Sequence, residues 1–386
     1  MTADKNPYQL NSVYVAGYRS LRQISFPVDR LSVFVGANGV GKTNLYRGLQ
    51  IIQAAAAGTL AREFAIEGGM TSVITAGGQR KDLQGQVNLS ASFGRDGEAS
   101  YSYEISIGFP PKEAFAAFAS EPLVKSETLS LHTARRKVAL LERRGPSLWM
   151  RNENGVREQV NDDLMFSETA LATVEDPSRF ADLYWLRRTL LDWRFYHGFR
   201  TDADSPLRRP CLAITTPTLA SDGANLAAVF ATLVHIRGDK AELDSAIEDA
   251  FPGAQLVVPR PDRHATFGMI FADHPHRVFE LGELSDGTLR YLALMGALLA
   301  YRLPKFVALN EPETSLHPAL PDPLARLIVD SAKHSQIWLV THSEQLAEAI
   351  AREGRMTPRR VIRKHGGTWI EGLKLSGEFD DDEADM

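Results

Sequence analysis

Residues 31–43 read LSVFVGANGVGKT, and this stretch decides the fold that the sequence predicts. Residues 31–35 are mostly apolar and β-branched or aromatic, which favours a short buried strand. The segment that follows fits the pattern G-x-x-x-x-G-K-[ST], and a helical stretch, TNLYRGLQIIQAAAA, begins at residue 43. A strand, a glycine-rich loop and a helix in this order predict a phosphate-binding loop.

Each residue type in this loop suits the binding of nucleotide phosphates. Backbone N–H groups bind phosphate oxygens, and glycines permit the dihedral angles and the close approach that this binding needs. The ammonium group of Lys42 would neutralise the β- and γ-phosphates, and the hydroxyl of Thr43 would bind Mg²⁺. The predicted binding residues are Gly36, Ala37, Asn38, Gly39, Val40, Gly41, Lys42 and Thr43.

The loop alone does not distinguish a kinase from a GTPase or an ATPase, but three downstream motifs do. Residues 284–288 read LSDGT before an apolar helical stretch, so that Ser285 and Gly287 would form a second anion-binding turn at a helix start. The apolar run 305–309 ends in Asn310-Glu311, and the run 336–340 ends in Thr341-His342. Together with the first loop, these motifs follow the order of an ABC-type ATPase: Walker A, signature, Walker B and switch histidine.

Length and composition limit the class of protein. A chain of 386 residues can bury a large core and should form one large domain or two. Cys211 is the single cysteine, which excludes disulfides and thiolate clusters and leads us to expect a reducing cytoplasm. The apolar run YLALMGALLAY (291–301) is too short to cross a bilayer, so we expect no membrane segment. No signal peptide is expected from the N-terminal sequence.

The acidic charge is concentrated at the end of the chain. Residues 378–386, EFDDDEADM, hold six acidic residues and no basic one, whereas the formal net charge of the whole chain is −5. We expect this tail to be disordered and solvated. The rest of the chain is therefore close to neutral and lacks the overall basic field of a constitutive DNA-binding protein.

The order of patterns along the chain predicts an interrupted α/β fold. Alternating segments at 86–93 and 100–109 predict an antiparallel hairpin joined by Arg95-Asp96-Gly97, and strand-like pieces continue to Gly155. Residues 162–200 are expected to be helical, with one face formed by Leu183, Leu186, Leu190 and Leu191. Two more helices are expected within 223–250, and the α/β character returns from residue 254.

Four segments carry a resemblance to a known family. They are GYRSLRQISFPVDRLSVFVGANGVGKTNL (17–45), LSDGTLRYLAL (284–294), LNEPETSLHP (309–318) and VTHSEQL (340–346). These segments resemble the RecF/SMC-like branch of the ABC ATPases, and within it the stand-alone predicted ATPases of the AAA/ABC class related to the overcoming-lysogenization-defect (OLD) proteins. The resemblance covers about residues 8–109 and 254–350.

The resemblance implies an α/β ABC-type ATPase head. Such a head has a mixed β-sheet around the phosphate loop, an antiparallel β lobe and, in this chain, a mixed α/β insert. The implied parts are an N-terminal lobe at 1–109, the insert at 110–222, a C-terminal lobe at 223–377 and the tail at 378–386.

The resemblance also implies roles for single residues. Family members enclose two ATP molecules between two heads, so that Ser285 and Gly287 would touch the γ-phosphate bound by the second subunit. Glu311 would be the base that orients the attacking water, and His342 would hydrogen-bond the γ-phosphate. Asn38 would lie near the subunit boundary. Arg19, which matches the arginine of the family's early F-R-S segment, would reach the nucleotide, whereas Tyr18 would stack on adenine or belong to the core.

Asn310 departs from the family pattern, which has aspartate at this position to hold Mg²⁺ or its waters. An amide oxygen accepts a hydrogen bond but supplies no negative charge. We therefore expect Thr43 and Asn310 to form a weakened Mg²⁺ position and hydrolysis to be slow. The Q-loop glutamine is not assigned; the candidates are Gln79, Gln84 and Gln86.

Several functions fit these features. The first is an ATP-gated homodimer that acts in DNA repair or in defence against foreign DNA. The second is a regulatory switch that signals to a separate effector protein without binding DNA. A transporter motor is disfavoured by the EPETSLHP form and by the insert before the signature.

His264, His274 and His276 are not expected to bind zinc, because paired carboxylates are lacking. A basic cluster is the first candidate for a DNA contact: Arg135, Arg136, Lys137, Arg143 and Arg144.

Overall fold

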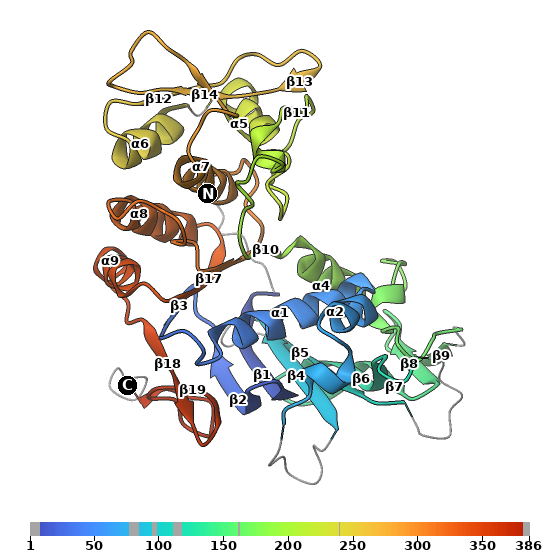
Figure 1. Cartoon of the computed structure of the whole chain (residues 1–386). Helices are drawn as coiled ribbons and strands as arrows, with labels where there is room; N and C mark the ends of the chain where they lie inside the picture. The colour runs from blue at the N-terminus through green and yellow to red at the C-terminus, as the bar shows by residue number, and fades with distance from the viewer. Residues whose placement is uncertain are drawn as a thin grey trace. The chain divides into compact units, whose positions relative to one another are not determined.

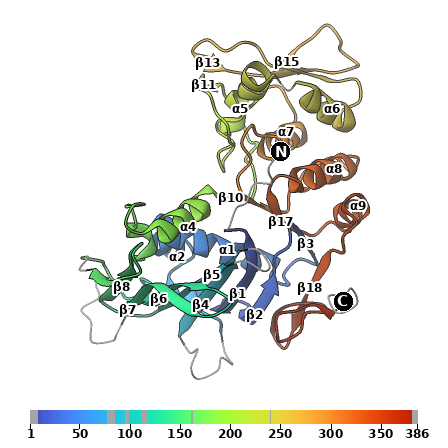
Figure 2. The ribbon, with the colours of Figure 1, turned by 180° about the vertical axis from the view of Figure 1, so that it is seen from behind.

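The computed structural model describes residues 8–76, 85–94, 99–110, 118–160, 163–238 and 240–380 (Figures 1 and 2). The chain divides into two compact units. The first contains residues 1–29, 37–193 and 360–386, and the second contains residues 30–36 and 194–359. The boundaries of these units differ from those that we expected from the sequence. The expected division into two lobes, an insert and a tail stays a prediction.

An antiparallel sheet of eight strands forms the first unit. Its order is β2-β1-β4-β5-β6-β7-β8-β9, so that after the first hairpin each strand pairs with the next along the chain. The alternation of apolar and polar residues explains why one face is buried; in β4 every second residue is buried. The strands are β1 (Leu10–Tyr18), β2 (Leu21–Pro27), β4 (Gln86–Phe93), β5 (Ser100–Gly108), β6 (Leu123–His132), β7 (Lys137–Arg144), β8 (Ser147–Arg151) and β9 (Arg157–Val160).

Helices cover one face of this sheet, and a hairpin lies beside β2. Figure 1 shows α1 along the strands, with α2 and α4 next to it. The helical segments are α1 (Lys42–Ala57), α2 (Leu60–Ile66), α3 (Met70–Val73), η2 (Leu171–Thr173) and α4 (Ala181–Asp192). The hairpin consists of β18 (Arg359–Lys364) and β19 (Gly367–Ile370).

The core of the first unit contains one buried pair of charged side chains. Glu127 and Arg143 are 0% and 1% exposed. Glu127 accepts hydrogen bonds from the Tyr103 hydroxyl at 2.9 Å and from the main chain of Ala170 and Leu171 at 2.6 and 2.8 Å. Burial lowers the pKa of Arg143, and the nearby charge of Glu127 opposes this. Arg143 is thus a structural residue and not part of a solvated basic cluster, which corrects the sequence-based interpretation.

Parallel strands form the centre of the second unit. The order β10-β16-β17-β3 places β3 beside β17 and β16 beside β17, all parallel. Every residue of β16 and β17 is buried, because helices on a parallel sheet leave neither face in water. The strands are β3 (Leu31–Val35), β10 (Arg194–Tyr196), β16 (Phe306–Asn310) and β17 (Gln336–Thr341).

Helices and two small sheets complete the second unit in the part of it that the structure describes. Helices α8 and α9 pack on β17, and α9 also contacts β3. The α-helices are α5 (Leu226–Thr232), α6 (Lys240–Ala250), α7 (Asp286–Leu298), α8 (Pro321–Ala332) and α9 (Glu344–Gly354), with shorter helical turns η3 (Pro206–Arg208) and η4 (Leu233–Arg237). The small sheets pair β11 (Cys211–Leu212) with β13 (His264–Ala265), and β12 (Gln255–Val257) with β14 (Gly268–Ile270) and β15 (Phe279–Glu280).

The expected elements are present with some differences. The strands at 86–93 and 100–108 pair as predicted, whereas their expected turn, Arg95-Asp96-Gly97, lies outside the described residues. The prediction of a long helical segment over 162–200 was wrong, because only Ala181–Asp192 forms an α-helix there. Leu191 is also 37% exposed and does not share the buried face of Leu183, Leu186 and Leu190.

Candidate nucleotide site

The glycine-rich loop joins the two units. Gly36 belongs to the second unit, and residues 37–43 belong to the first. In the second unit, the N–H of Gly36 donates a hydrogen bond of 3.3 Å to the carbonyl oxygen of Thr341, at the end of the neighbouring strand β17. The loop therefore begins where the parallel strands end, which is the edge at which ligands bind in open α/β sheets.

In the first unit, the rest of the loop closes on itself. Lys42 is only 4% exposed, and its Nζ donates a hydrogen bond of 2.9 Å to the carbonyl oxygen of Ala37. Gly39 and Gly41 have φ angles of +82° and +99°, in the region that favours glycine. Ala37, Asn38 and Gly39 are exposed, so their backbone groups are accessible to a ligand.

Three residues that the sequence analysis did not identify support this part of the loop. Thr368, on β19, donates a hydrogen bond from Oγ1 to the carbonyl oxygen of Val40 at 2.7 Å. Its Oγ1 also lies 2.6 Å from Ser20 Oγ, which accepts a hydrogen bond of 2.6 Å from Asn44 Nδ2. Ser20 and Asn44 lie within the quoted segment 17–45, but Thr368 has no sequence signal, because only the fold brings β19 to the loop.

Arg19 and Tyr18 are both bound to Glu67 in the first unit. Arg19, with a φ angle of +47°, has Nη2 2.8 Å from Glu67 Oε2. Tyr18 is 0% exposed, and its hydroxyl donates to the same carboxylate at 2.6 Å. Burial and this carboxylate raise the pKa of Tyr18 well above its usual range. These contacts favour the core interpretation of Tyr18 over adenine stacking.

In the second unit, Asn310 is the last residue of β16. It is 4% exposed, and its Oδ1 atom is buried with no hydrogen-bond partner among the described residues. A buried oxygen without a donor is costly in a folded protein and calls for an explanation such as a bound ion. Glu311 follows with a φ angle of +47°, and its N–H donates to the carbonyl oxygen of Val340 at 2.8 Å.

Glu313 and His342 form the most connected part of this edge. Glu313 Oε1 accepts hydrogen bonds from Thr341 Oγ1 at 2.5 Å and from the N–H groups of His342 and Ser343 at 3.1 and 3.2 Å. His342 Nδ1 lies 3.2 Å from the same oxygen and 3.7 Å from Glu311 Oε1. The imidazole is therefore placed between two carboxylates.

The signature turn is at the N-terminus of α7 in the second unit. Ser285 is the N-cap, and its Oγ accepts a hydrogen bond of 3.2 Å from the N–H of Thr288. A side chain at Gly287 would come within 3.0 Å of the carbonyl oxygen of Ser315, so the turn packs closely on the loop after β16. Arg290 donates to the Thr314 carbonyl oxygen of that loop at 2.7 Å.

The donor set fits a hydrated divalent cation shared with phosphates. Among the described residues, no group of three or more His, Cys, Asp or Glu side chains could hold a metal ion on its own. Asn310 Oδ1 and Glu313 Oε2, however, are buried oxygens without hydrogen-bond partners in the described part of the chain. Oxygens of this kind suit Mg²⁺, which keeps waters and binds through few protein ligands plus substrate phosphates.

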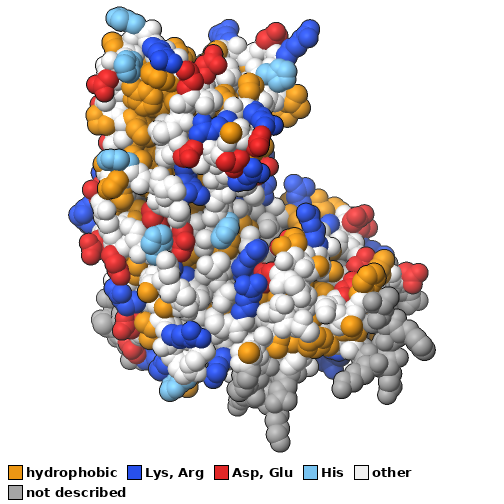
Figure 3. All heavy atoms as spheres, viewed as in Figure 1, with side chains coloured by type: hydrophobic (Ala, Val, Ile, Leu, Met, Phe, Trp, Pro, Cys, Tyr) orange, Lys and Arg blue, Asp and Glu red, His pale blue; other side chains and the backbone are white. Residues whose placement is uncertain are grey.

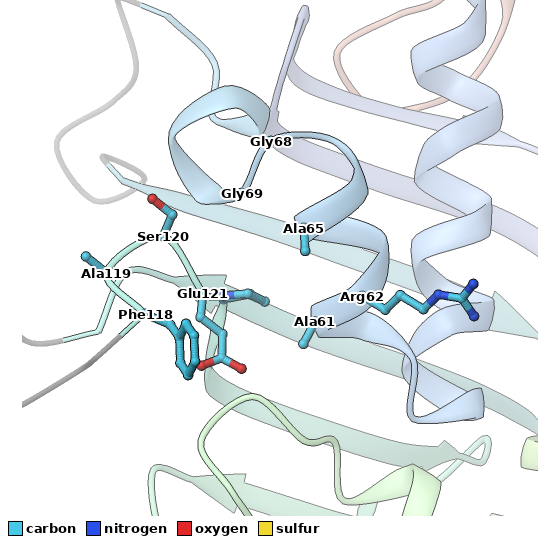
Figure 4. Close-up of a pocket in the computed structure, with 10 residues that line it drawn as sticks. Ala61, Arg62, Ala65, Gly68, Gly69, Phe118, Ala119, Ser120 and Glu121 are labelled. Carbon is cyan, nitrogen blue, oxygen red and sulfur yellow. The ribbon is translucent and has the colours of Figure 1, made fainter.

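One cavity of the first unit is lined by residues outside the glycine-rich loop. It has a volume of 610 Å³ and is lined mainly by small side chains of α2 and by residues 118–122. Figure 4 shows Ala61 and Ala65 of α2 beside the segment that carries Phe118, Ser120 and Glu121. The cavity contains none of the loop residues, and we assign it no part in nucleotide binding.

A parallel strand that leads into a glycine-rich loop, with Thr-His at the end of the adjacent strand β17 and Asn-Glu at the end of the next strand β16, defines the class of ABC-type P-loop ATPases. The family described as "AAA domain, putative AbiEii toxin, Type IV TA system" matches residues 31–348, and the chain belongs to this family. The ABC-type, RecF/SMC-like resemblance is thereby confirmed, whereas the relation to the OLD proteins stays a prediction.

Solved structures show the same fold at low sequence identity. An SMC head bound to the C-terminal winged-helix domain of ScpA is 15% identical and covers 96% of this chain and 99% of its own, with a TM-score of 0.53. An SMC head with an extended coiled coil, bound to the C-terminal domain of ScpA derived from Pyrococcus furiosus, is 14% identical and covers 96% and 97%, with a TM-score of 0.50. These similarities confirm the fold class, an ABC-type ATPase head.

Curated relatives match part of the chain. ABC transporter A family members 4 and 3 of Arabidopsis thaliana are 28% and 31% identical over 163 residues, which is 40% of this chain. The match spans only 15% and 16% of the lengths of these two relatives. No helix in the described part of this chain is long and apolar enough to cross a membrane.

Proposed function

We propose that this protein binds ATP with Mg²⁺ and hydrolyses it slowly to ADP and phosphate. The observation that carries the proposal is the cluster of Glu311, Glu313 and His342 at the ends of β16 and β17, next to the start of the glycine-rich loop at Gly36. Each of these groups is placed at one sheet edge by parallel strands, where phosphates are held in this class of fold.

In the proposed reaction, the loop holds the phosphates. The exposed N–H groups of the loop would bind phosphate oxygens, and Lys42 would exchange its contact with the Ala37 carbonyl for one with a phosphate. Thr43 and Asn310 would hold Mg²⁺, which supplies positive charge to the phosphates. Arg19 would reach the nucleotide only by leaving Glu67.

Glu311 would act as the base. Its carboxylate takes a proton from water while the water oxygen bonds to the γ-phosphorus and the bond to the β–γ bridging oxygen breaks. ADP carries away the electron pair of that bond, and the Nε2 atom of His342 accepts a hydrogen bond from the hydroxyl group that the new phosphate gains from the water. Glu311 is the better candidate than Glu313, because its side chain is 30% exposed, whereas that of Glu313 is 8% exposed and already accepts three hydrogen bonds.

We propose that two copies enclose the nucleotides. Ser285 is exposed at the N-terminus of a 13-residue helix, where its hydroxyl and the helix dipole favour an anion. In a homodimer this turn would complete the γ-phosphate site of the second subunit. ATP would then join the subunits, and hydrolysis would release them.

Two variants test the proposed ATPase activity and the proposed dimer together. Glu311→Gln keeps the shape of the side chain and removes its basicity, and a positioned base contributes about 10²–10⁴ in rate. This variant should accumulate as an ATP-bound dimer in light scattering with Mg-ATP, whereas Lys42→Ala should stay monomeric and bind no ATP by calorimetry. Wild-type turnover by Glu311→Gln would place the base elsewhere.

A basic cavity in the first unit favours nucleic acid as a further partner. The cavity has a volume of 940 Å³, and its lining includes Arg22, Lys364, Lys374 and the ring of Trp369. Cations beside an aromatic ring are the combination that binds the phosphates and bases of single strands. Thr368 also lines the cavity and donates to the Val40 carbonyl of the glycine-rich loop, which would link occupancy to the nucleotide state.

Elsewhere the charge gives little support for DNA binding. In the described part of the face shown in Figure 3, basic and acidic side chains are interspersed. On the β6–β7 hairpin, Lys137 pairs with Glu104 at 3.4 Å and Arg144 with Glu142 at 3.2 Å. We therefore move the proposed DNA contact from this hairpin to the cavity. Fluorescence anisotropy with a labelled single strand should show ATP-dependent, salt-sensitive binding that Arg22→Glu abolishes and Arg144→Glu does not.

The alternative is an ATP-dependent regulatory switch that signals to a protein partner without binding DNA. Leu212, Ile214 and Ile236 are 67%, 66% and 63% exposed, and Ile214 and Ile236 line a cavity of 380 Å³ in the second unit. Exposed apolar side chains around a hollow suit a protein partner. If Arg22→Glu leaves binding of the labelled single strand unchanged, or the wild type binds none, this alternative is favoured.

A further inference from the structure

Glu313 connects the loop after β16 to the turn between β17 and α9 through a single carboxylate oxygen. Its Oε1 accepts from Thr341 Oγ1, from the N–H of His342 and from the N–H of Ser343. Two consecutive N–H groups that converge on one anion form a nest of the kind that binds phosphate. Here an internal carboxylate occupies it and fixes the turn between β17 and α9.

The same oxygen is the nearest carboxylate to the His342 ring. Nδ1 lies 3.2 Å from Glu313 Oε1, against 3.7 Å from Glu311 Oε1. A carboxylate that accepts a hydrogen bond from one ring nitrogen fixes the tautomer and the orientation of an imidazole, as a buried aspartate does in hydrolase triads. The 3.2 Å contact places Nδ1 next to Glu313, so that a hydrogen on Nδ1 would be favoured by the carboxylate, whereas Nε2 is on the opposite side of the ring.

We propose that Glu313 is a positioning residue that sets the tautomer and orientation of His342 toward the γ-phosphate. This inference rests on the proposed ATPase function and assigns to the two carboxylates different tasks. Glu311 acts on water, whereas the Oε1 atom of Glu313 acts through His342 and the turn that carries it. The turn is also tied to the glycine-rich loop, because the Thr341 carbonyl accepts from the N–H of Gly36. Loss of the Glu313 contacts would therefore disturb both His342 and the start of the glycine-rich loop.

The first test follows the imidazole without reference to turnover. In protein labelled with ¹⁵N-histidine, the His342 signals of the wild type should show a protonated Nδ1 and an unprotonated Nε2 at neutral pH. Glu313→Gln can offer its amide N–H₂ group to Nδ1, so the Nε2-protonated tautomer should become populated. A matched control is Glu348→Gln, an exposed carboxylate on α9. Identical His342 signals in wild type and Glu313→Gln would overturn the inference.

The second test separates positioning from a structural role by a double-mutant cycle. Glu313→Gln should lower kcat by about 10-fold or more, while the KM for ATP changes by less than about 3-fold. In the His342→Ala background, Glu313→Gln should have little further effect on kcat, because the residue acts through the histidine. An equal loss of kcat in both backgrounds would overturn the positioning role. If the wild type shows no ATPase activity, the proposed function fails, and the tautomer measurement still decides the role of Glu313.

Discussion

The N–H of Gly36 donates a hydrogen bond to the carbonyl oxygen of Thr341, and this contact joins the first residue of the glycine-rich loop to the residue before His342. It exists because β3 and β17 are parallel neighbours that end at the same edge, with Val35 opposite Thr341. The start of the glycine-rich loop and the turn that carries His342 are therefore held by the same hydrogen bond. A change on either side should affect both.

Gly41 provides the sharpest steric test of the loop. A Cβ atom at this position would lie 1.9 Å from Thr368 Oγ1 and 2.5 Å from Ser20 Oγ, and the φ angle of +99° already disfavours a side chain. Gly41→Ala should displace the loop or β19 and weaken ATP binding by at least about 10-fold, or about 1.4 kcal/mol. Calorimetric titration with Mg-ATP measures this change.

Gly39→Ala is the matched control for that substitution. Gly39 has a similar φ angle of +82°, but a Cβ atom there would meet nothing within 4 Å. Gly39→Ala therefore introduces the backbone strain without the steric clash. This strain costs about 1–2 kcal/mol of stability. Equal ATP affinity of the two variants would mean that the contact of Thr368 with the loop does not matter for binding.

Ser285→Arg should separate nucleotide binding from assembly. The substitution removes the N-cap of α7, whose loss typically costs about 1 kcal/mol, and places a large cation at an exposed helix end. We expect ATP affinity of the monomer to be retained and ATP-dependent dimerisation to be lost. Ser285→Thr keeps a capping hydroxyl and should dimerise. Normal dimerisation by Ser285→Arg in analytical ultracentrifugation would exclude the composite site.

Much of the fold and of the candidate site follows from local patterns. The runs before Gly36, Asn310 and Thr341 predict buried strands, because each is short and mostly apolar. Their alignment at one edge then follows from the parallel sheet. The same reasoning fails for Thr368 and Glu67, since their contacts join segments far apart in the chain and neither has a recognisable pattern. Arg143 was misassigned because a basic side chain gives no sequence signal for burial beside Glu127.

Glu127→Ala should strongly destabilise the first unit. The substitution leaves the main-chain N–H groups of Ala170 and Leu171 without an acceptor and removes the larger of the carboxylate charges that act on Arg143. Breaking a buried pair in this way costs about 3–5 kcal/mol. Urea denaturation measures the loss. Glu104→Ala, which removes a carboxylate with a side chain 49% exposed, should change stability by less than about 0.5 kcal/mol; similar losses in both would contradict the buried-pair account.

The last prediction concerns the amide at position 310, where the Asn310 Oδ1 atom is buried without a hydrogen-bond partner among the described residues. Asn310→Asp adds a negative charge at a site that is 4% exposed, so the protein without metal should be less stable than the wild type. Mg²⁺ with ADP should restore this stability, since a ligand that binds only the folded state stabilises it. The variant should also reach half-maximal ATPase activity at a lower Mg²⁺ concentration, because a carboxylate is a stronger Mg²⁺ ligand than an amide.

Thermal unfolding across a Mg²⁺ series, with Asn310→Ala as the reference, measures the effect of Asn310→Asp on stability independently of turnover. Equal Mg²⁺ dependence of unfolding in the wild type and in Asn310→Asp would show that this side chain does not face the metal.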